Sequence, residues 1–255
     1  MDHNLKAIVR YDGTDFAGWQ IQPDARTVQG EIEGALSRIA SQPIRIQGAG
    51  RTDAGVHALG QVFSCHWPKA PDTDRLCRSL SSMLGPEIRV ESIEVVPPDF
   101  NARFSATSKR YAYAISLTRE PDPLSARYAW SVPWKLYIER LAELAIFLVG
   151  THDFAGFHCS GSDIQTTVRT LYSVEVLSGG IAGPCDARDL YRLELWGDGF
   201  LYKMVRNIAG LLVDIARGAV PESRLMEVVN APGPFHGHTA PAHGLTLVEV
   251  LYQGT

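Results

Sequence analysis

Apolar and polar positions in the first hundred residues follow the spacings of strands and helices. Short apolar or alternating runs predict four strands: Leu5–Tyr11, Ile44–Gln47, Val56–Cys65 and Ile88–Val96. Apolar residues at helical spacing follow Thr27, which is placed to act as an N-cap. The apolar face of a second helix, which Gly85-Pro86 ends, consists of Leu76, Leu80, Met83 and Leu84. This half is predicted to run strand, helix, strand, loop, strand, helix, strand.

The second half of the chain repeats this theme. Its predicted strands are Lys109–Leu117, Val168–Leu177, Leu190–Trp196 and Leu245–Tyr252. Its predicted helices are Leu136–Val149, Gly199–Arg217 and residues 222–229. Two α/β halves of similar order, residues 1–104 and 105–255, predict a sheet that spans both, with a cleft where they meet.

Composition is ordinary for a soluble globular protein, with 45% hydrophobic and 20% charged residues. No apolar run approaches the roughly 18–20 residues that span a bilayer, and the first residues lack the features of a signal peptide. We therefore expect a cytoplasmic protein without a membrane partner. The cysteines form no CxxC pair, so neither a disulfide framework nor a zinc ribbon is indicated; they are Cys65, Cys77, Cys159 and Cys185.

The net charge of −4 does not by itself indicate nucleic-acid binding. Two segments are nevertheless locally basic. Residues 101–119 and 199–213 contain no acidic residue, and their cations are Arg103, Lys109, Arg110, Arg119, Lys203 and Arg206. Both a charged groove and chance are consistent with these segments.

The run from Gly48 to His57 is the most informative part of the sequence. It places Asp53 on a loop with three glycines and with Arg51 two residues before it. The glycines permit sharp turns and close approach of a ligand, and an opposite charge nearby favours the ionised carboxylate. Asp53 could serve as a nucleophile, a general base or half of a structural ion pair. A dinucleotide site is excluded, because Asp53 takes the third glycine position and a strand follows the loop.

Three further groups of residues have both a structural and a functional interpretation. The histidines His236, His238 and His243 are more typical of a solvated loop than of a metal site. Tyr111 follows two cations on a strand, so it is either a core aromatic or a platform for a base. Lys203, Arg206 and Asn207 have the spacing of one helix face, which is either a solvated stripe or the partner of Asp53.

Taken together, a set of blocks resembles the tRNA pseudouridine synthase A family. The blocks are residues 11–14, 18–20, 26–30, 50–58, 60–62, 102–106, 110–111, 152–154, 199–207, 239–242 and 244–245. They occur in family order over almost the whole chain. The most specific of them is Arg51-Thr52-Asp53-Ala54-Gly55-Val56-His57.

The resemblance implies the pseudouridine synthase fold, with a mixed, largely antiparallel sheet and a central active-site cleft. It also implies isomerisation of uridine to pseudouridine at positions 38, 39 and 40 of the tRNA anticodon stem-loop, by a homodimer without cofactor or metal. Asp53 takes the position of the catalytic aspartate, and the residues expected to bind the substrate are Tyr111, Arg51, Arg206 and Leu245. The residues expected to bind RNA are Arg26, Arg103, Lys109, Arg110 and Lys203.

The chain departs from the family pattern at four positions: Ser81, Gly85, Asn101 and His238. None is an expected catalytic or substrate-binding residue, so these departures concern finer tRNA contacts. Whether Asp53 attacks a carbon or removes a proton stays open at the level of sequence. The alternative function is a tRNA-binding or folding protein with the same fold and no turnover.

Overall fold

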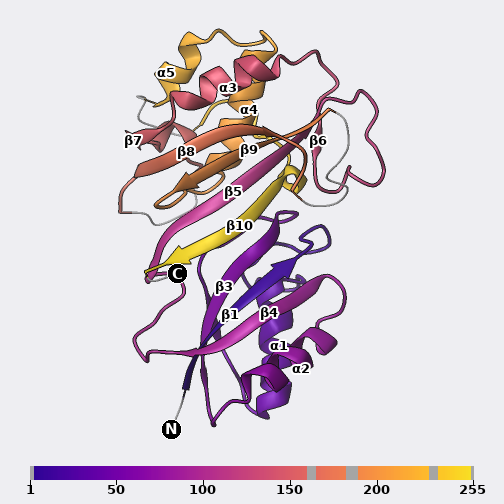
Figure 1. The fold of residues 1–255 in the computed structure, drawn as a ribbon, viewed down its shortest axis with the longest axis vertical. Helices are drawn as coiled ribbons and strands as arrows, with labels where there is room; N and C mark the ends of the chain where they lie inside the picture. Colours follow the sequence, from indigo (N-terminus) through magenta and orange to yellow (C-terminus); the bar gives the residue numbers. More distant parts are fainter. Residues whose placement is uncertain (1–2, 160–164, 182–188, 230–234, 254–255) are drawn as a thin grey trace. The chain divides into compact units, whose positions relative to one another are not determined.

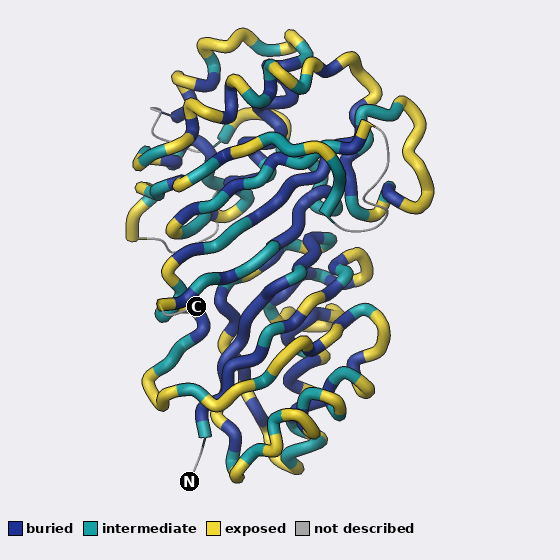
Figure 2. The backbone as a smooth tube through the Cα atoms, in the orientation of Figure 1, coloured by how far each residue is buried: buried dark blue, intermediate teal, exposed yellow. Residues whose placement is uncertain are grey.

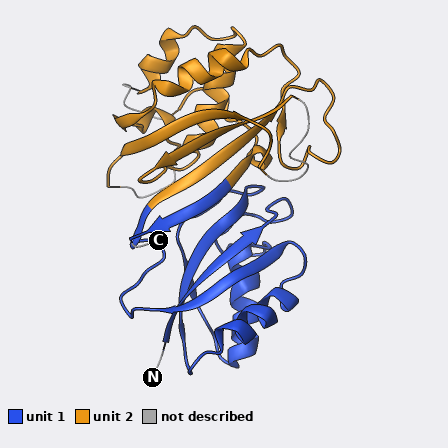
Figure 3. Ribbon diagram, viewed as in Figure 1, with its two compact units in different colours: residues 1–107, 247–255 blue, residues 108–246 orange. Residues whose placement is uncertain are grey.

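The computed structural model describes residues 3–159, 165–181, 189–229 and 235–253. It contains two compact units (Figure 3), residues 1–107 with 247–255 and residues 108–246. The strands belong to a ten-stranded sheet in which parallel and antiparallel pairs both occur, and the antiparallel pairs predominate. The predicted α/β class with a mixed, largely antiparallel sheet is confirmed.

The first unit is built on strands in the order β4-β1-β3-β10. These strands are β1 (His3–Tyr11), β3 (His57–Trp67), β4 (Ile88–Val96) and β10 (Leu245–Tyr252). A short strand, β2 (Ile46–Gly48), pairs antiparallel with β3. The two helices, α1 (Val28–Ala40) and α2 (Thr73–Met83), contact each other, and α2 packs against β4 (Figure 1).

The helices of this unit begin where side chains can cap them. Thr27 accepts a hydrogen bond from the backbone N–H of Gly30, as its position in the sequence predicts. Asp72 caps α2 in the same way through Arg75 N–H. Leu76 and Leu80 are buried, whereas Met83 at the end of the predicted apolar face is 37% exposed. The buried face of α2 is therefore narrower than predicted.

The second unit has the strand order β5-β9-β8-β7. Its strands are β5 (Ala106–Ser116), β6 (Trp130–Ser131, parallel to β5), β7 (Gly150–Asp153), β8 (Val168–Ser178) and β9 (Leu190–Gly197). Its helices are α3 (Ile138–Ile146), α4 (Met204–Ala216) and α5 (Ser223–Val229), with 3-10 turns η1 (Ala155–Phe157) and η2 (Ala242–Gly244). Helix α3 packs against β8 and α4. Every residue of β5 from Tyr111 to Ser116 is buried (Figure 2), so both faces of this strand are covered.

Several elements of this unit differ from the pattern-based prediction; strand β6, for example, was not predicted. Helix α4 begins at Met204 and not at Gly199, because Lys203 has a φ of 60°, a left-handed conformation that a helix interior does not allow. Helix α3 is shorter than predicted. Gly150, with a φ of 113°, begins strand β7, which the apolar pattern did not reveal.

Residues 247–255 group with the first unit although they end the chain. The proposed division at residue 104 gives the catalytic aspartate loop to the first half of the chain and the tyrosine and arginine of the cleft to the second. This division stays a prediction. The same holds for a cleft between the halves. Cys185 lies outside the described residues.

Candidate active site

The loop that carries Asp53 connects β2 to β3. The Asp53 carbonyl accepts a hydrogen bond from Val56 N–H at 3.1 Å, and Gly55 within this turn has a φ of 79°. A positive φ of this size favours glycine, as the sequence analysis expected for this loop. Asp53 itself is half-buried, between the buried Thr52 and the exposed Ala54. The loop thus presents one carboxylate from a tightly closed turn.

A second loop, residues 12–20, holds the Asp53 loop through its backbone. The N–H of Trp19 donates to the Thr52 carbonyl at 3.0 Å. A Cβ on Gly18 would lie 2.7 Å from the same carbonyl oxygen, and Gly18 has a φ of 96°. A Cβ on Gly13 would lie 2.0 Å from the Val56 carbonyl oxygen. The two loops can approach this closely only because both positions are glycine.

Buried polar side chains give the Asp53 loop further support. The hydroxyl groups of Tyr11 and Thr52 are 2.9 Å apart. Gln61, which is fully buried, donates to the Gly50 carbonyl at 2.9 Å. Burial raises the pKa of Tyr11 to about 12, against the opposing effect of its hydrogen bonds to Thr52 and Gln61, so its hydroxyl stays neutral at physiological pH.

The imidazole of His57 connects the end of the Asp53 loop to the turn at residues 12–14. Its Nδ1 lies 3.1 Å from the backbone nitrogen of Gly13, which donates to it, and 3.2 Å from Asp12 Oδ1. The Asp12 carboxylate also accepts hydrogen bonds from the backbone N–H and the hydroxyl of Thr14. His57 is buried, so it acts here as a structural link.

Arg51 is exposed, and its Nε donates to the side-chain oxygen of Gln20 at 3.2 Å. The Nε of Arg51 therefore binds a neutral amide. The rest of the guanidinium has donors that can bind further groups.

The second unit contains Tyr111, Arg206 and Leu245. Tyr111 lies on β5 and is 8% exposed, and its ring meets that of Phe200 edge-on with centroids 5.0 Å apart. Phe200 belongs to the turn that precedes α4. Phe200 is not among the residues predicted from the sequence, because nothing local links it to a tyrosine 89 positions earlier.

Arg206 lies in the first turn of α4 and is bound to the segment 239–245. Its Nε donates to the Ala240 carbonyl at 2.8 Å, and the Ala240 N–H donates to the Arg206 carbonyl at 3.1 Å. A Cβ on Gly210, one helical turn later, would lie 1.8 Å from the His238 carbonyl oxygen. The glycine therefore allows the segment to lie directly on the helix.

The predicted stripe of Lys203, Arg206 and Asn207 is wrong as a solvated helix face. Lys203 precedes the helix, and Asn207 is fully buried. The Asn207 amide donates to the Phe157 carbonyl at 2.8 Å and accepts from the Thr239 hydroxyl at 2.7 Å. Asn207 joins η1, α4 and the 239–245 segment, which a helical wheel cannot show.

The charge of Arg206 acts on two other groups of this unit. Burial raises the pKa of Tyr113, and the guanidinium of Arg206 opposes this shift. Burial lowers the pKa of His243, and Arg206 lowers it further, against a backbone hydrogen bond with Ala129. The Tyr113 hydroxyl donates to the Pro241 carbonyl at 2.8 Å. Leu245, which follows this segment, is 7% exposed, as befits an apolar wall.

The cations expected to bind RNA differ in their surroundings. Arg26 forms ion pairs with Glu87 at 3.2 Å and Glu31 at 3.4 Å. Arg26 also lies over the ring of the buried Phe16, 4.4 Å from its centroid. Three others lie over aromatic rings: Arg103 over Phe104, Arg110 over Trp196 and Lys203 over Tyr202. Lys109, on β5, is paired with Gly197. The rings of Phe104 and Tyr202 are exposed. Tyr172 is exposed as well, and its ring meets that of Trp196 edge-on. Cations beside exposed rings suit a single-stranded nucleic acid.

Asp53 and Arg51 thus belong to one unit, and Tyr111, Arg206 and Leu245 to the other. Their joint action in one site stays a prediction. In the described part of the chain, no group of three or more His, Cys, Asp or Glu side chains is placed to hold a metal ion. Within the same residues, no helix is long and apolar enough to cross a membrane.

Comparisons with known proteins identify the family of the chain. A family model described as tRNA pseudouridine synthase matches residues 7–105 and 144–253. The tRNA pseudouridine synthase A of Streptococcus agalactiae serotype Ia is 38% identical over 250 residues, which are 97% of this chain and 95% of the relative. The tRNA pseudouridine synthase A of Streptococcus thermophilus is 39% identical, and that of Geobacter sulfurreducens is 36% identical. Each match covers 97% of this chain, together with 98% of the Streptococcus protein and 99% of the Geobacter protein. The chain belongs to the tRNA pseudouridine synthase family.

Proposed function

We propose that this protein isomerises uridine to pseudouridine in tRNA, at positions 38, 39 and 40 of the anticodon stem-loop. The observation that carries the proposal is the Asp53 loop. A single carboxylate is held there by backbone hydrogen bonds, glycine contacts and buried side chains, within a chain that matches tRNA pseudouridine synthases over almost its whole length.

The reaction requires one bond to break and another to form on the same base. The glycosidic bond between ribose C1′ and uracil N1 breaks, the uracil turns, and a bond forms between C1′ and C5. The proton on C5 is lost and N1 gains one, so the net change is an isomerisation without an oxidant or a reductant. A carboxylate such as Asp53 can begin this as a nucleophile or as a base on the sugar.

The second unit supplies groups that suit the rest of the task. An extruded base loses its stacking energy, which an aromatic face such as that of Tyr111 offsets in part. Arg206 provides a fixed positive charge, because its Nε is bound to the Ala240 carbonyl. Leu245 provides an apolar surface that excludes water. In this proposal Asp53, Tyr111, Arg206 and Leu245 surround the same uridine.

RNA binding is assigned to Arg26, Arg103, Lys109, Arg110 and Lys203, which neutralise phosphates on a protein with a net charge of −4. We assign the working form as a homodimer across which the tRNA lies. The affinity for tRNA should fall steeply with rising salt, since bound phosphates release counterions. A binding constant that does not change with salt would contradict this assignment.

The decisive experiment is pseudouridine mapping of tRNA after incubation with wild-type and Asp53→Ala protein. The wild type should convert uridines 38–40, and the variant should be slower by at least about 10²-fold, the usual cost of losing an acid–base group. Asp99→Ala, which removes an exposed carboxylate of the same unit, is the matched control and should remain fully active. A wild type that binds tRNA and leaves its uridines unchanged would favour the non-catalytic alternative.

A further inference from the structure

A continuous line of hydrogen-bonded side chains crosses the first unit and ends at Arg51. It starts with Arg45, whose Nη1 lies 2.7 Å from Glu33 Oε2. The amide of Gln29 donates to Glu33 Oε1 at 2.9 Å, and the amide of Gln20 donates to Gln29 Oε1 at 2.8 Å. Arg51 Nε then donates to Gln20 Oε1 at 3.2 Å. The line connects α1 to the loop that carries Asp53.

The orientation of Gln29 within this line is fixed by groups that cannot reverse their roles. Its NH2 group also donates to the Ile46 carbonyl at 3.3 Å, and its oxygen also accepts from Ile21 N–H at 3.2 Å. A turned amide would place donors against donors and acceptors against acceptors at four contacts. Gln29 is 9% exposed, so water cannot easily replace the lost partners.

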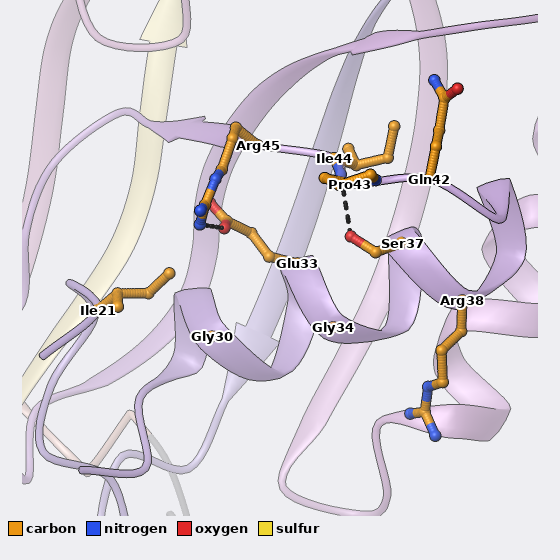
Figure 4. A pocket seen from close by; sticks show the side chains of 10 residues that line it. All are labelled: Ile21, Gly30, Glu33, Gly34, Ser37, Arg38, Gln42, Pro43, Ile44 and Arg45. Atoms are coloured by element: carbon orange, nitrogen blue, oxygen red, sulfur yellow. Dashed lines mark hydrogen bonds and ion pairs between the residues drawn. The ribbon is translucent and has the colours of Figure 1, made fainter. Parts of the chain in front are cut away.

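Glu33 sets the far end of the line. It is 5% exposed and, as a carboxylate, can only accept, which requires Gln29 to present its NH2 group. The Ile46 N–H donates to Glu33 Oε1 at 3.1 Å, so the same carboxylate also fixes the start of β2. Figure 4 shows Glu33 and Arg45 facing each other at the surface of a groove of about 540 Å³, with the ion pair between them dashed.

The consequence falls on Gln20, which is half-buried. Since Gln29 offers it an oxygen, Gln20 must present its NH2 group there and turn its own oxygen toward Arg51, which can only donate. Glu33 can only accept and Arg51 can only donate. Together they thus determine the orientation of the side-chain amides of Gln29 and Gln20 between them.

We infer that Gln20 is a positioning residue for the substrate-binding Arg51, with Gln29 and Glu33 fixing the direction in which Gln20 acts. This inference rests on the proposed function and on the expectation, stated from the sequence, that Arg51 binds the substrate. Gln20 binds Arg51 Nε and leaves the terminal nitrogens of the guanidinium to meet a phosphate or a base. An arginine held in advance loses less conformational freedom on binding, so the tRNA is bound more tightly.

The first test is made on the free protein and does not depend on activity. In the wild type, the heteronuclear NOE of the Arg51 Nε–H group, measured by NMR, should be high, which indicates restricted motion. The restriction should disappear in Gln20→Met and persist in Gln20→Glu, which keeps an acceptor for Arg51. Gln22→Met is the matched control, because Gln22 lies in the same connection between β1 and α1 and donates to the Ala17 carbonyl at 2.7 Å. An Arg51 equally mobile in wild type and Gln20→Met would overturn the inference.

The second test measures tRNA binding and turnover. Gln20→Met should weaken tRNA binding by about two- to tenfold, the range expected for one hydrogen bond, while Gln22→Met should not. The saturated rate should change less than the affinity. In an Arg51→Met background, Gln20→Met should have no further effect; a full additional loss there would contradict action through Arg51. If the wild type binds tRNA without converting uridine, the proposed function fails. The mobility of Arg51 and the affinity for tRNA would still test the role of Gln20.

Discussion

The Asp53 loop and the Arg206 region show two ways of holding a functional side chain. The loop is held by backbone groups: Trp19 N–H on the Thr52 carbonyl, and glycines 13 and 18 against the backbone of residues 52–56. Arg206 is held by its own side chain, through Nε on the Ala240 carbonyl. The first arrangement fixes the backbone that carries Asp53, whereas the second uses the side chain of Arg206 itself.

The largest effects should come from the glycines at the two contacts. Gly18→Ala forces a Cβ to 2.7 Å from the Thr52 carbonyl at a φ of 96°, and Gly210→Ala forces one to 1.8 Å from the His238 carbonyl. We expect each to cost about 1–3 kcal/mol of stability. Activity should fall by roughly 10²-fold in Gly18→Ala, because a shifted loop misplaces Asp53, and by less in Gly210→Ala.

Chemical denaturation and single-turnover kinetics measure these two losses. Gly34→Ala is the control. Gly34 lies inside α1, and no atom lies within 4 Å of the position that a Cβ would take there. The free energy of unfolding of this variant should rise by about 0.5–1 kcal/mol, and its activity should not change. An equal loss of activity from Gly18→Ala and Gly210→Ala would remove the distinction between the two supports.

Tyr111→Phe tests the second region at its aromatic face. The phenyl ring keeps its contact with Phe200, so tRNA affinity should change by less than about twofold. Turnover should fall by about 10²-fold, because we propose here that the hydroxyl takes part in removing the proton from C5. Rates measured at saturating tRNA separate the two quantities. Unchanged turnover would restrict Tyr111 to stacking.

The smallest effect concerns His243, whose pKa is lowered by burial and by Arg206 from an ordinary value of 6.5. Below pH 6.5 the unfolded chain binds a proton that the folded chain resists. Stability is therefore unaffected by this group above that pH and falls as the pH drops, by at most about 1.4 kcal/mol per unit. His243→Gln should lose less stability between pH 7.5 and 5.5 than wild type, as denaturation curves at the two values can show. The exposed His236, changed to Gln, should not alter this difference.

Much of the fold followed from local patterns. Strands Ile88–Val96 and Leu245–Tyr252 have the predicted bounds, and Thr27 caps the predicted helix. These features depend on side-chain alternation and on hydrogen bonds that span a few residues. Helix α4 was predicted to begin at Gly199 because the apolar spacing continues through that turn, whereas the left-handed Lys203 ends the helical backbone there.

The sequence by itself determined the Asp53 loop, since its glycines, its carboxylate and its arginine lie within ten consecutive positions. Only the tertiary structure decided what surrounds it. The hydrogen bond of Arg51 to Gln20 and the bonds of Asn207 to Phe157 and Thr239 join residues that are far apart in the chain. Such hydrogen bonds exist because packing removes water and brings their partners together, and no periodicity in the sequence encodes that choice.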